Sequence, residues 1–335
     1  MNQSIYSDIK FAIDNPGERY AWIGYHVLVL VSSLVGDTLI LVATFRKGAF
    51  KVNTFIISVL QQVAVSDLVN AVFGTLPVLI TLSANSWVLG DRLCYVTVYT
   101  FFFVYSAGMS LIAMITTSKF LILRYPLRAA SWSAGRAHLV CTFVWLFALT
   151  NPVVKLAVDK DDVYFDYRNY GCNYNFSSDL WKRELLPMMV LCYFIVPNVV
   201  IVATTIPTLS YLAGARKSAR RVRGSVPWQG ATTVALTATV YFISTLPMIV
   251  YFIGKHFIRD QTGQFHTSFY RVSYFLMMIN IMSNFYIYTL TIRSFRRFLL
   301  SVMGLTVSVS LQISTDATIT GKKQLLKGMI ISSMT

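Results

Sequence analysis

Long stretches without charge constrain the fold of this chain more than any other feature. From Tyr95 to Ser118 no residue is charged, and the charge returns abruptly at Lys119. A helix needs about 20 apolar residues to cross a hydrocarbon layer about 30 Å thick. Segments that reach or nearly reach this length lie at approximately 20–45, 54–83, 93–118, 137–157, 185–213, 229–254 and 268–292. Only helices satisfy every backbone group within one membrane segment, so the sequence predicts an all-α membrane protein, a seven-transmembrane helix bundle.

Composition supports a membrane protein over a soluble one. Hydrophobic residues make up 55% of the chain and charged residues 13%, whereas soluble domains carry about 25% charged residues. The net charge of +15 would fit a nucleic-acid partner in a soluble protein. Here the cations fall between apolar runs, so we attribute them to membrane topology and expect no nucleic-acid partner. The alternative, buried helices of a large soluble protein, fits so many long segments poorly.

The distribution of charge predicts an orientation. The loops near 46–53, 119–136 and 214–228 contain no acidic residue. Together with the segment after 292 they hold most of the Lys and Arg residues and a single acid, Asp316. Because cytoplasmic loops are enriched in cations, we expect the N-terminus outside and the C-terminus inside.

Two tripeptides match the N-glycosylation acceptor pattern. Asn2-Gln3-Ser4 and Asn175-Phe176-Ser177 both fall on the expected outer side, so Asn2 and Asn175 are candidate glycosylation sites.

The four cysteines divide into two kinds. Cys141 and Cys192 lie inside apolar runs, where a thiol is expected to be an inert core group. Cys94 and Cys172 lie at segment edges, where an oxidising exterior allows a disulfide.

A set of short motifs, in order along about residues 20–300, resembles the class A (rhodopsin-like) G-protein-coupled receptors. The motifs are Ser66-Asp67-Leu68, Trp87-Val-Leu-Gly90 followed by Cys94, Tyr125-Pro-Leu-Arg128, Trp145, Cys172 in Tyr-Gly-Cys-Asn, Pro197, Pro247, Asn280, Asn284-Phe-Tyr-Ile-Tyr288 and Phe295-Arg-Arg-Phe298. The resemblance implies a disulfide between Cys94 and Cys172 and a short amphipathic eighth helix. It also implies an extracellular tail at 1–19, a transmembrane domain with helix 8 at 20–303 and a cytoplasmic tail at 304–335.

The resemblance implies a multi-pass plasma-membrane receptor that transmits binding of an extracellular ligand to a heterotrimeric G protein. Arrestin and membrane lipid are further implied partners. The chain carries no enzyme signature, because the histidines are dispersed without metal-ligand spacing and no phosphate-binding loop or nucleophile elbow occurs. A transporter is a weaker alternative, since inverted repeats are not visible.

Several positions depart from the family pattern. Ser118-Lys119-Phe120 stands in place of Asp-Arg-Tyr, Thr245 in place of the sixth-helix aromatic switch, Phe285 in place of the seventh-helix proline and Thr205 in place of the fifth-helix tyrosine. Lysine is a point charge where arginine offers a planar fork, and Ser118 cannot hold Lys119 by charge. The resemblance assigns the G-protein face and switch to Ser118, Lys119, Phe120, Arg128 and Tyr288. These departures leave open a binding or decoy receptor that holds ligand without coupling.

An acidic residue, Asp37, replaces the first-helix asparagine of the family. The resemblance places Asp37, Asp67, Asn280 and Asn284 together near the membrane centre, where a lone carboxylate costs about 2.5–3.5 kcal/mol. Two facing carboxylates cannot both ionise cheaply without a cation, so we expect a shared proton or a sodium ion as the only cofactor. Gly108 replaces the usual third-helix serine and weakens the sodium alternative. Two singly protonated, merely hydrogen-bonded acids are an equally simple interpretation.

The resemblance also gives a ligand pocket with an aromatic and thioether lining, suited to an apolar or amphipathic ligand. Its residues are Phe101, Tyr105, Met189, Tyr193, Met248, Phe252, Tyr270 and Tyr274. Phe101 stands where amine receptors have aspartate, and Met278 where photopigments have lysine, so neither an amine nor retinal is expected. Helix packing alone also explains each aromatic residue. The acids Asp159, Asp161, Asp162 and Asp166 could attract a basic peptide, although a solvated loop explains them more simply.

Overall fold

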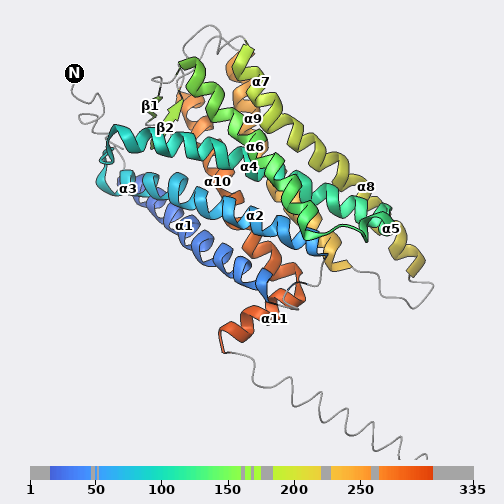
Figure 1. Ribbon diagram of the computed structural model, residues 1–335. Coiled ribbons are helices and arrows are strands. Elements are labelled where there is room, and N and C mark those ends of the chain that lie inside the picture. Colours follow the sequence, from blue (N-terminus) through green and yellow to red (C-terminus); the bar gives the residue numbers. More distant parts are fainter. Residues whose placement is uncertain are drawn as a thin grey trace, which may run out of the picture.

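The computed structural model describes residues 16–46, 50, 53–159, 163–166, 170–174, 184–219, 228–257 and 264–304, and these form a bundle of long helices (Figure 1). The longer helices are α1 (Pro16–Phe45), α2 (Thr54–Asn70), α3 (Leu76–Ala84), α4 (Gly90–Arg124), α6 (Ala134–Asp159), α8 (Val196–Ala219), α9 (Trp228–Phe257), α10 (Gln264–Thr291) and α11 (Arg293–Val302). Short α5 (Pro126–Ala129) and α7 (Leu186–Val190) complete the α-helices of the described part.

The predicted membrane segments are confirmed. Two of them contain a π-helical turn, η1 (Ala71–Thr75) between α2 and α3, and η3 (Leu191–Ile195) between α7 and α8. Within the described residues, 6 helices are long and apolar enough to cross a membrane. The seventh span, Ser268–Thr291, is followed after a bend of 100° by Arg293–Val302, which gives α11 the position of the expected eighth helix.

Helix α4 lies at the centre of the bundle. It contacts α2, α6, α8 and α9, and it also contacts two short strands, β1 (Val163–Asp166) and β2 (Gly171–Tyr174). Its side chains Tyr105, Met109 and Leu111 are buried. The helix that carries the uncharged stretch from Tyr95 to Ser118 is therefore the one around which the others pack.

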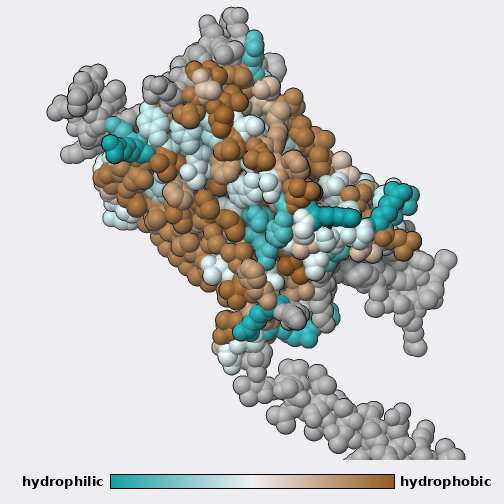
Figure 2. Space-filling model, in the orientation of Figure 1, coloured by the Kyte–Doolittle hydropathy of each residue, from teal (hydrophilic) through white to brown (hydrophobic). Residues whose placement is uncertain are grey.

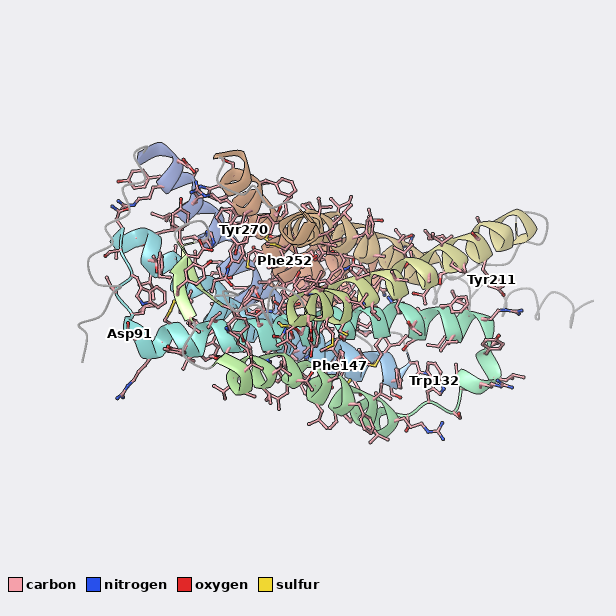
Figure 3. All side chains as sticks on the ribbon, turned by 90° about the horizontal axis from the view of Figure 1, so that it is seen from above. Asp91, Trp132, Phe147, Tyr211, Phe252 and Tyr270 are labelled. Carbon is pink, nitrogen blue, oxygen red and sulfur yellow. A yellow bond between two sulfur atoms is a disulfide. The ribbon has the colours of Figure 1, made fainter. Side chains whose placement is uncertain are left out.

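The strands β1 and β2 form an antiparallel hairpin that the sequence did not predict. Val163 pairs with Tyr174, and Phe165 with Cys172. We call the end of the bundle that carries this hairpin the hairpin end. The opposite end, with Arg124, Arg128 and the arginines of α11, is the basic end. In Figure 3, Asp91 marks the hairpin end and Trp132 and Tyr211 mark the basic end.

The flank of the bundle is hydrophobic, as expected of a surface that faces lipid. Figure 2 shows broad hydrophobic areas along this flank. On α6, the side chains of Leu139, Phe143 and Leu146 are all more than half exposed. Exposed apolar area on this scale is typical of a membrane-facing surface.

Gly36 on α1 faces the large side chain of Phe285 on α10, so the two residues are complementary in size. A Cβ atom at Gly36 would lie 2.6 Å from both Cβ and Cγ of Phe285. The phenylalanine that replaces the family's seventh-helix proline is therefore accommodated by the missing side chain at position 36.

We predict that Gly36→Ala destabilises the bundle by about 1–3 kcal/mol, because the added methyl group overpacks the α1–α10 contact. Thermal unfolding of the purified full chain in one detergent measures this. Gly24→Ala is the matched control on the same helix, since no atom lies within 4 Å of its added Cβ. The double variant Gly36→Ala/Phe285→Ala should be more stable than Gly36→Ala alone. Equal losses of stability in Gly36→Ala and Gly24→Ala would contradict the explanation by size.

Candidate functional site

The hairpin is fixed to the bundle by a disulfide between Cys94 at the start of α4 and Cys172 in β2, with 5.4 Å between the Cα atoms. This confirms the expected bond. At the same end, Trp87 Nε1 donates a hydrogen bond of 3.2 Å to the carbonyl of Gly90, whose φ of 74° is left-handed. Glycine adopts this conformation without a Cβ clash, so the Trp-Val-Leu-Gly motif forms the turn into α4.

A narrow pocket of about 40 Å³ lies beneath the hairpin, with room for a few water molecules. No side chain that lines it in the described part of the chain is charged. The lining is Phe73, Gly74, Pro77, Val78, Trp87, Thr97, Val98, Phe101, Phe102, Gly171, Cys172, Asn173, Phe194, Met248, Phe252, Tyr270, Tyr274 and Met277. One polar pair in this lining is Asn173 and Tyr270, in which Asn173 Nδ2 donates to the Tyr270 hydroxyl at 2.8 Å.

The structure brings together Phe101, Met248, Phe252, Tyr270 and Tyr274 of the residues expected in the ligand pocket. Their role in binding remains a prediction.

The other three do not line this pocket. Tyr105 lies one turn deeper, with its ring stacked on Phe101 at 5.7 Å between centroids. Tyr193 turns toward α6, where its hydroxyl bonds to Thr150 and its ring contacts Phe147. Met189 is buried in the same hydrophobic core as Tyr105.

The hairpin and Trp87 contribute to the pocket although sequence reasoning missed them. Which residues of the segment between α6 and α7 turn inward depends on the strand register, which no local pattern in the sequence sets.

An ion pair joins helices α1 and α10. Glu18 Oε1 on α1 lies 2.5 Å from an Arg271 guanidinium nitrogen on α10 and accepts a hydrogen bond of 3.2 Å from Trp22. The Arg271 guanidinium also lies over the Tyr170 ring, 5.2 Å from its centroid. Burial raises the pKa of Tyr170, while Arg271 acts in the opposite direction. The network connects α1, α10 and the hairpin.

Two charged residues are buried at the hairpin, one on α6 and one in β1. Lys155 on α6 is fully buried, with its ammonium 5.7 Å from the centroid of the Tyr174 ring. Asp166 in β1 is 1% exposed and accepts a hydrogen bond from the Tyr164 hydroxyl at 3.1 Å. The expectation that Asp166 belongs to a solvated loop is therefore wrong, because the hairpin folds it inward. Asp161, Asp162 and the side chain of Asp159 lie outside the described residues, as do Asn2 and Asn175.

The four residues expected at the membrane centre are all buried. Asp67 Oδ2 on α2 accepts a hydrogen bond of 2.9 Å from Asn284 Nδ2 on α10. Asp37 Oδ2 on α1 accepts one of 2.5 Å from Ser33, whose hydroxyl also lies 3.4 Å from the Asp67 carbonyl oxygen. Ser33 therefore links the two acidic positions, and its spacing of four residues from Asp37 was the available sequence signal.

The fourth residue, Asn280, points partly elsewhere. Its Oδ1 accepts a hydrogen bond of 2.8 Å from Ser244 on α9. Nearby helices present buried polar atoms without a protein partner, namely Asp37 Oδ1, Asn70 Oδ1, Thr75 Oγ1, Tyr105 OH and Asn280 Nδ2. Buried polar atoms are normally satisfied by water or an ion when protein partners are missing.

Three hydroxyl groups on α9, from Tyr241, Ser244 and Thr245, bind three different helices, and we call them the α9 hydroxyl cluster. Tyr241 contacts the sulfur of Met109 on α4. Ser244 donates to Asn280 on α10, and Thr245 donates to Asn198 Oδ1 on α8 at 3.1 Å. The position of the family's aromatic switch therefore carries a hydrogen bond instead of a large ring.

The residues expected at the G-protein face lie at the basic end, but no hydrogen bond or ring contact of the described part joins them to one another. Ser118 and Tyr288 are buried, Lys119 and Phe120 are half-buried, and Arg128 is exposed. The Tyr288 ring instead packs edge-to-face on Phe50.

Long apolar helices, a lipid-facing flank and a disulfide-tethered hairpin define a multi-pass membrane protein with a pocket between its helices. The model of the family "7 transmembrane receptor (rhodopsin family)" matches residues 36–288. The chain belongs to this family, whose members are receptors and not enzymes.

Individual relatives share shorter stretches. Proteinase-activated receptor 1 of Xenopus laevis is 30% identical over 80 residues, 24% of this chain and 19% of that protein. The human uracil nucleotide/cysteinyl leukotriene receptor is 26% identical over 136 residues, 40% of this chain and 36% of the relative. Human lysophosphatidic acid receptor 6 is 26% identical over 109 residues, 32% of each chain. The chain thus matches well under half the length of each.

We predict that Thr245→Val lowers stability by about 1 kcal/mol, because Asn198 Oδ1 is left without its donor inside the bundle. Thermal unfolding of the purified full chain reports the loss. Thr237→Val is the control, since Thr237 is buried on the same helix and forms no hydrogen bond in the described part. If both substitutions lower stability equally, the bond between α8 and α9 has no specific contribution.

Proposed function

We propose that this receptor signals through a heterotrimeric G protein when an uncharged, largely apolar ligand binds beneath the hairpin. The hairpin end is then extracellular, as the absence of acids in the opposite loops supports. The observation that carries the proposed ligand class is the uncharged lining of the pocket in the described residues.

The pocket chemistry argues against several charged ligands. A phosphate needs cationic or multiple N–H partners when it leaves water, and an amine needs an acid. The pocket offers aromatic rings, methionine thioethers and the Asn173–Tyr270 pair instead. The named relatives include receptors for a nucleotide and for lysophosphatidic acid, both phosphate compounds, so the proposed ligand class differs from theirs.

The proposed mechanism is a shift between two arrangements of the helices. A ligand between Phe101, Phe252 and Tyr274 would displace rings that fill the narrow pocket. Phe252 lies on α9 two turns from Thr245, so its movement would act on the α9 hydroxyl cluster. Breaking the bonds to Asn198 and Asn280 would free α9 to move at the basic end, where a G protein would bind.

A ligand screen read out by G-protein dissociation tests the proposal, with uncharged apolar compounds set against nucleotides, lysophospholipids and basic peptides. For an active compound, Phe252→Ala should lower affinity at least about tenfold, as loss of a central aromatic contact does. The control is Phe147→Ala, whose ring lies on α6 outside the pocket lining (Figure 3). Activation by charged compounds alone, or equal losses in both variants, would overturn the proposed ligand class.

The decoy receptor remains the second candidate, because Lys119 has no acidic partner within the described part of the chain. We predict that Lys119→Arg raises ligand-stimulated nucleotide exchange about two- to fivefold, since a guanidinium can bind a partner's backbone through two N–H groups. Lys119→Gln is the control that removes the charge and should lower exchange. Ligand binding without exchange in the unmodified chain and in Lys119→Arg would favour the decoy.

We also propose that Asp37 and Asp67 share a proton or hold one sodium ion. The donor set fits, because Asp37 Oδ1 is a buried oxygen with no partner and carboxylates are hard oxygen ligands. A bound sodium ion would neutralise charge between α1, α2 and α10, with Asn280 and Asn284 as neighbouring amides. A Cβ atom at Gly108 would lie 3.1 Å from Ser66 Oγ. Ser66 therefore occupies the space that the family's usual serine at position 108 would take.

We predict that sodium raises the unfolding temperature of the unmodified receptor and that Asp37→Asn removes most of this rise. A sodium ion that binds only the folded pair of carboxylates stabilises the folded receptor by mass action. In Asp37→Asn a single carboxylate remains, and a proton alone can neutralise it. Asp91→Asn is the control, as Asp91 is an exposed acid at the hairpin end. A response to pH without one to sodium would favour the shared proton, and no response to either would make the pair purely structural.

A further inference from the structure

A groove of about 240 Å³ lies between α4 and α8 near the basic end. Its walls are Phe120, Leu123 and Arg124 on α4, and Pro207, Thr208 and Tyr211 on α8. One turn nearer the membrane centre, Thr204 donates a hydrogen bond of 3.1 Å to Thr116, which joins the two helices. The groove therefore begins where the last such bond between α4 and α8 in the described part ends.

The groove is open to the membrane. Thr208 at the base of the groove is buried, and its hydroxyl donates a hydrogen bond of 2.7 Å to the Thr204 carbonyl. Tyr211 at its edge is 55% exposed, and the neighbouring side chains Ile206 and Leu209 are also exposed. Figure 3 places Tyr211 at the end of the bundle opposite Asp91. An apolar channel at this depth, flanked by lipid-facing residues, matches the hydrocarbon chain of a lipid.

The polar end of the groove is cationic without compensation. Arg124 is exposed, and both its guanidinium and that of Arg128 lie within 6 Å of the Tyr125 ring, at 5.5 and 5.8 Å. Neither forms an ion pair in the described residues, and the sequence has no acid in the segments 119–136 and 214–228. Exposed cations without an acidic neighbour attract anions from outside this part of the chain, and a lipid with an anionic headgroup is such an anion.

We propose that this groove binds one anionic phospholipid, with an acyl chain against Phe120, Leu123 and Pro207 and the headgroup at Arg124 and the Tyr211 hydroxyl. The proposal is independent of the proposed signalling function. It commits to a membrane lipid because a free phosphate would use Arg124 but not the apolar channel.

Native mass spectrometry of the purified full chain tests the site, with phosphatidylserine compared with phosphatidylcholine of the same acyl chains. Arg124→Gln should lower the affinity for phosphatidylserine about fivefold, the effect of one cation near a membrane surface. Arg136→Gln is the charge-matched control, because Arg136 is exposed on α6, outside the groove, and donates to Ser131 at 3.1 Å. Its affinity should match that of the unmodified chain.

A second measurement locates the lipid. Phosphatidylserine with a photoreactive group in its acyl chain should label residues 120–124 and 207–211 in the unmodified chain reconstituted in vesicles. Labelling elsewhere, equal binding of phosphatidylcholine, or an equal loss in Arg136→Gln overturns the proposal. Displacement by inorganic phosphate at equal concentration also overturns it, since that identifies a free-anion site.

Discussion

The absence of water from the lipid of a bilayer is the constraint on which the rest of this structure depends, because polar groups there need partners from the protein or from water and ions that it encloses. Hydrogen bonds between helices meet this requirement at each level of the bundle. Ser66 donates to the Val104 carbonyl across α2 and α4 at 2.9 Å, and Trp145 donates to Gln62 across α6 and α2 at 3.0 Å. Such bonds contribute only about 0.6 kcal/mol each on average, so they select one arrangement of helices more than they hold it together.

The departures from the family pattern are compensated by their neighbours in space. Phe285 fits because position 36 has no side chain, and Ser66 approaches α4 because position 108 has none. Thr245 replaces a large ring with a hydrogen bond to α8, and Ser244 beside it binds α10. The same helix positions thus remain in contact, but through hydroxyl groups that need less space than an aromatic ring.

The two ends of the bundle differ in chemistry as their surroundings require. At the hairpin end, Glu18 pairs with Arg271, and Lys155 is buried under the hairpin. At the basic end, Arg124 and Arg128 stack on one tyrosine without an acid. Helix α11 adds an apolar side, since Phe295 and Phe298 are buried while the Arg46 guanidinium lies over the Phe298 ring at 5.6 Å. The paired charges join α1 to α10, whereas cations without an acidic partner suit a membrane surface.

The sequence by itself determined the seven spans, their charge asymmetry and the family, because hydrophobic length and cation placement are local properties of the chain. It also located the disulfide and five pocket residues by their motif positions. Only the tertiary structure decided that Tyr193 turns toward α6, that Asp166 is buried and that the hairpin and Trp87 close the pocket. It also decided that Ser33 links Asp37 to α2 and that Asn280 bonds to α9. These outcomes depend on helix rotation, strand register and rotamer choice, which arise from contacts between residues far apart in the chain.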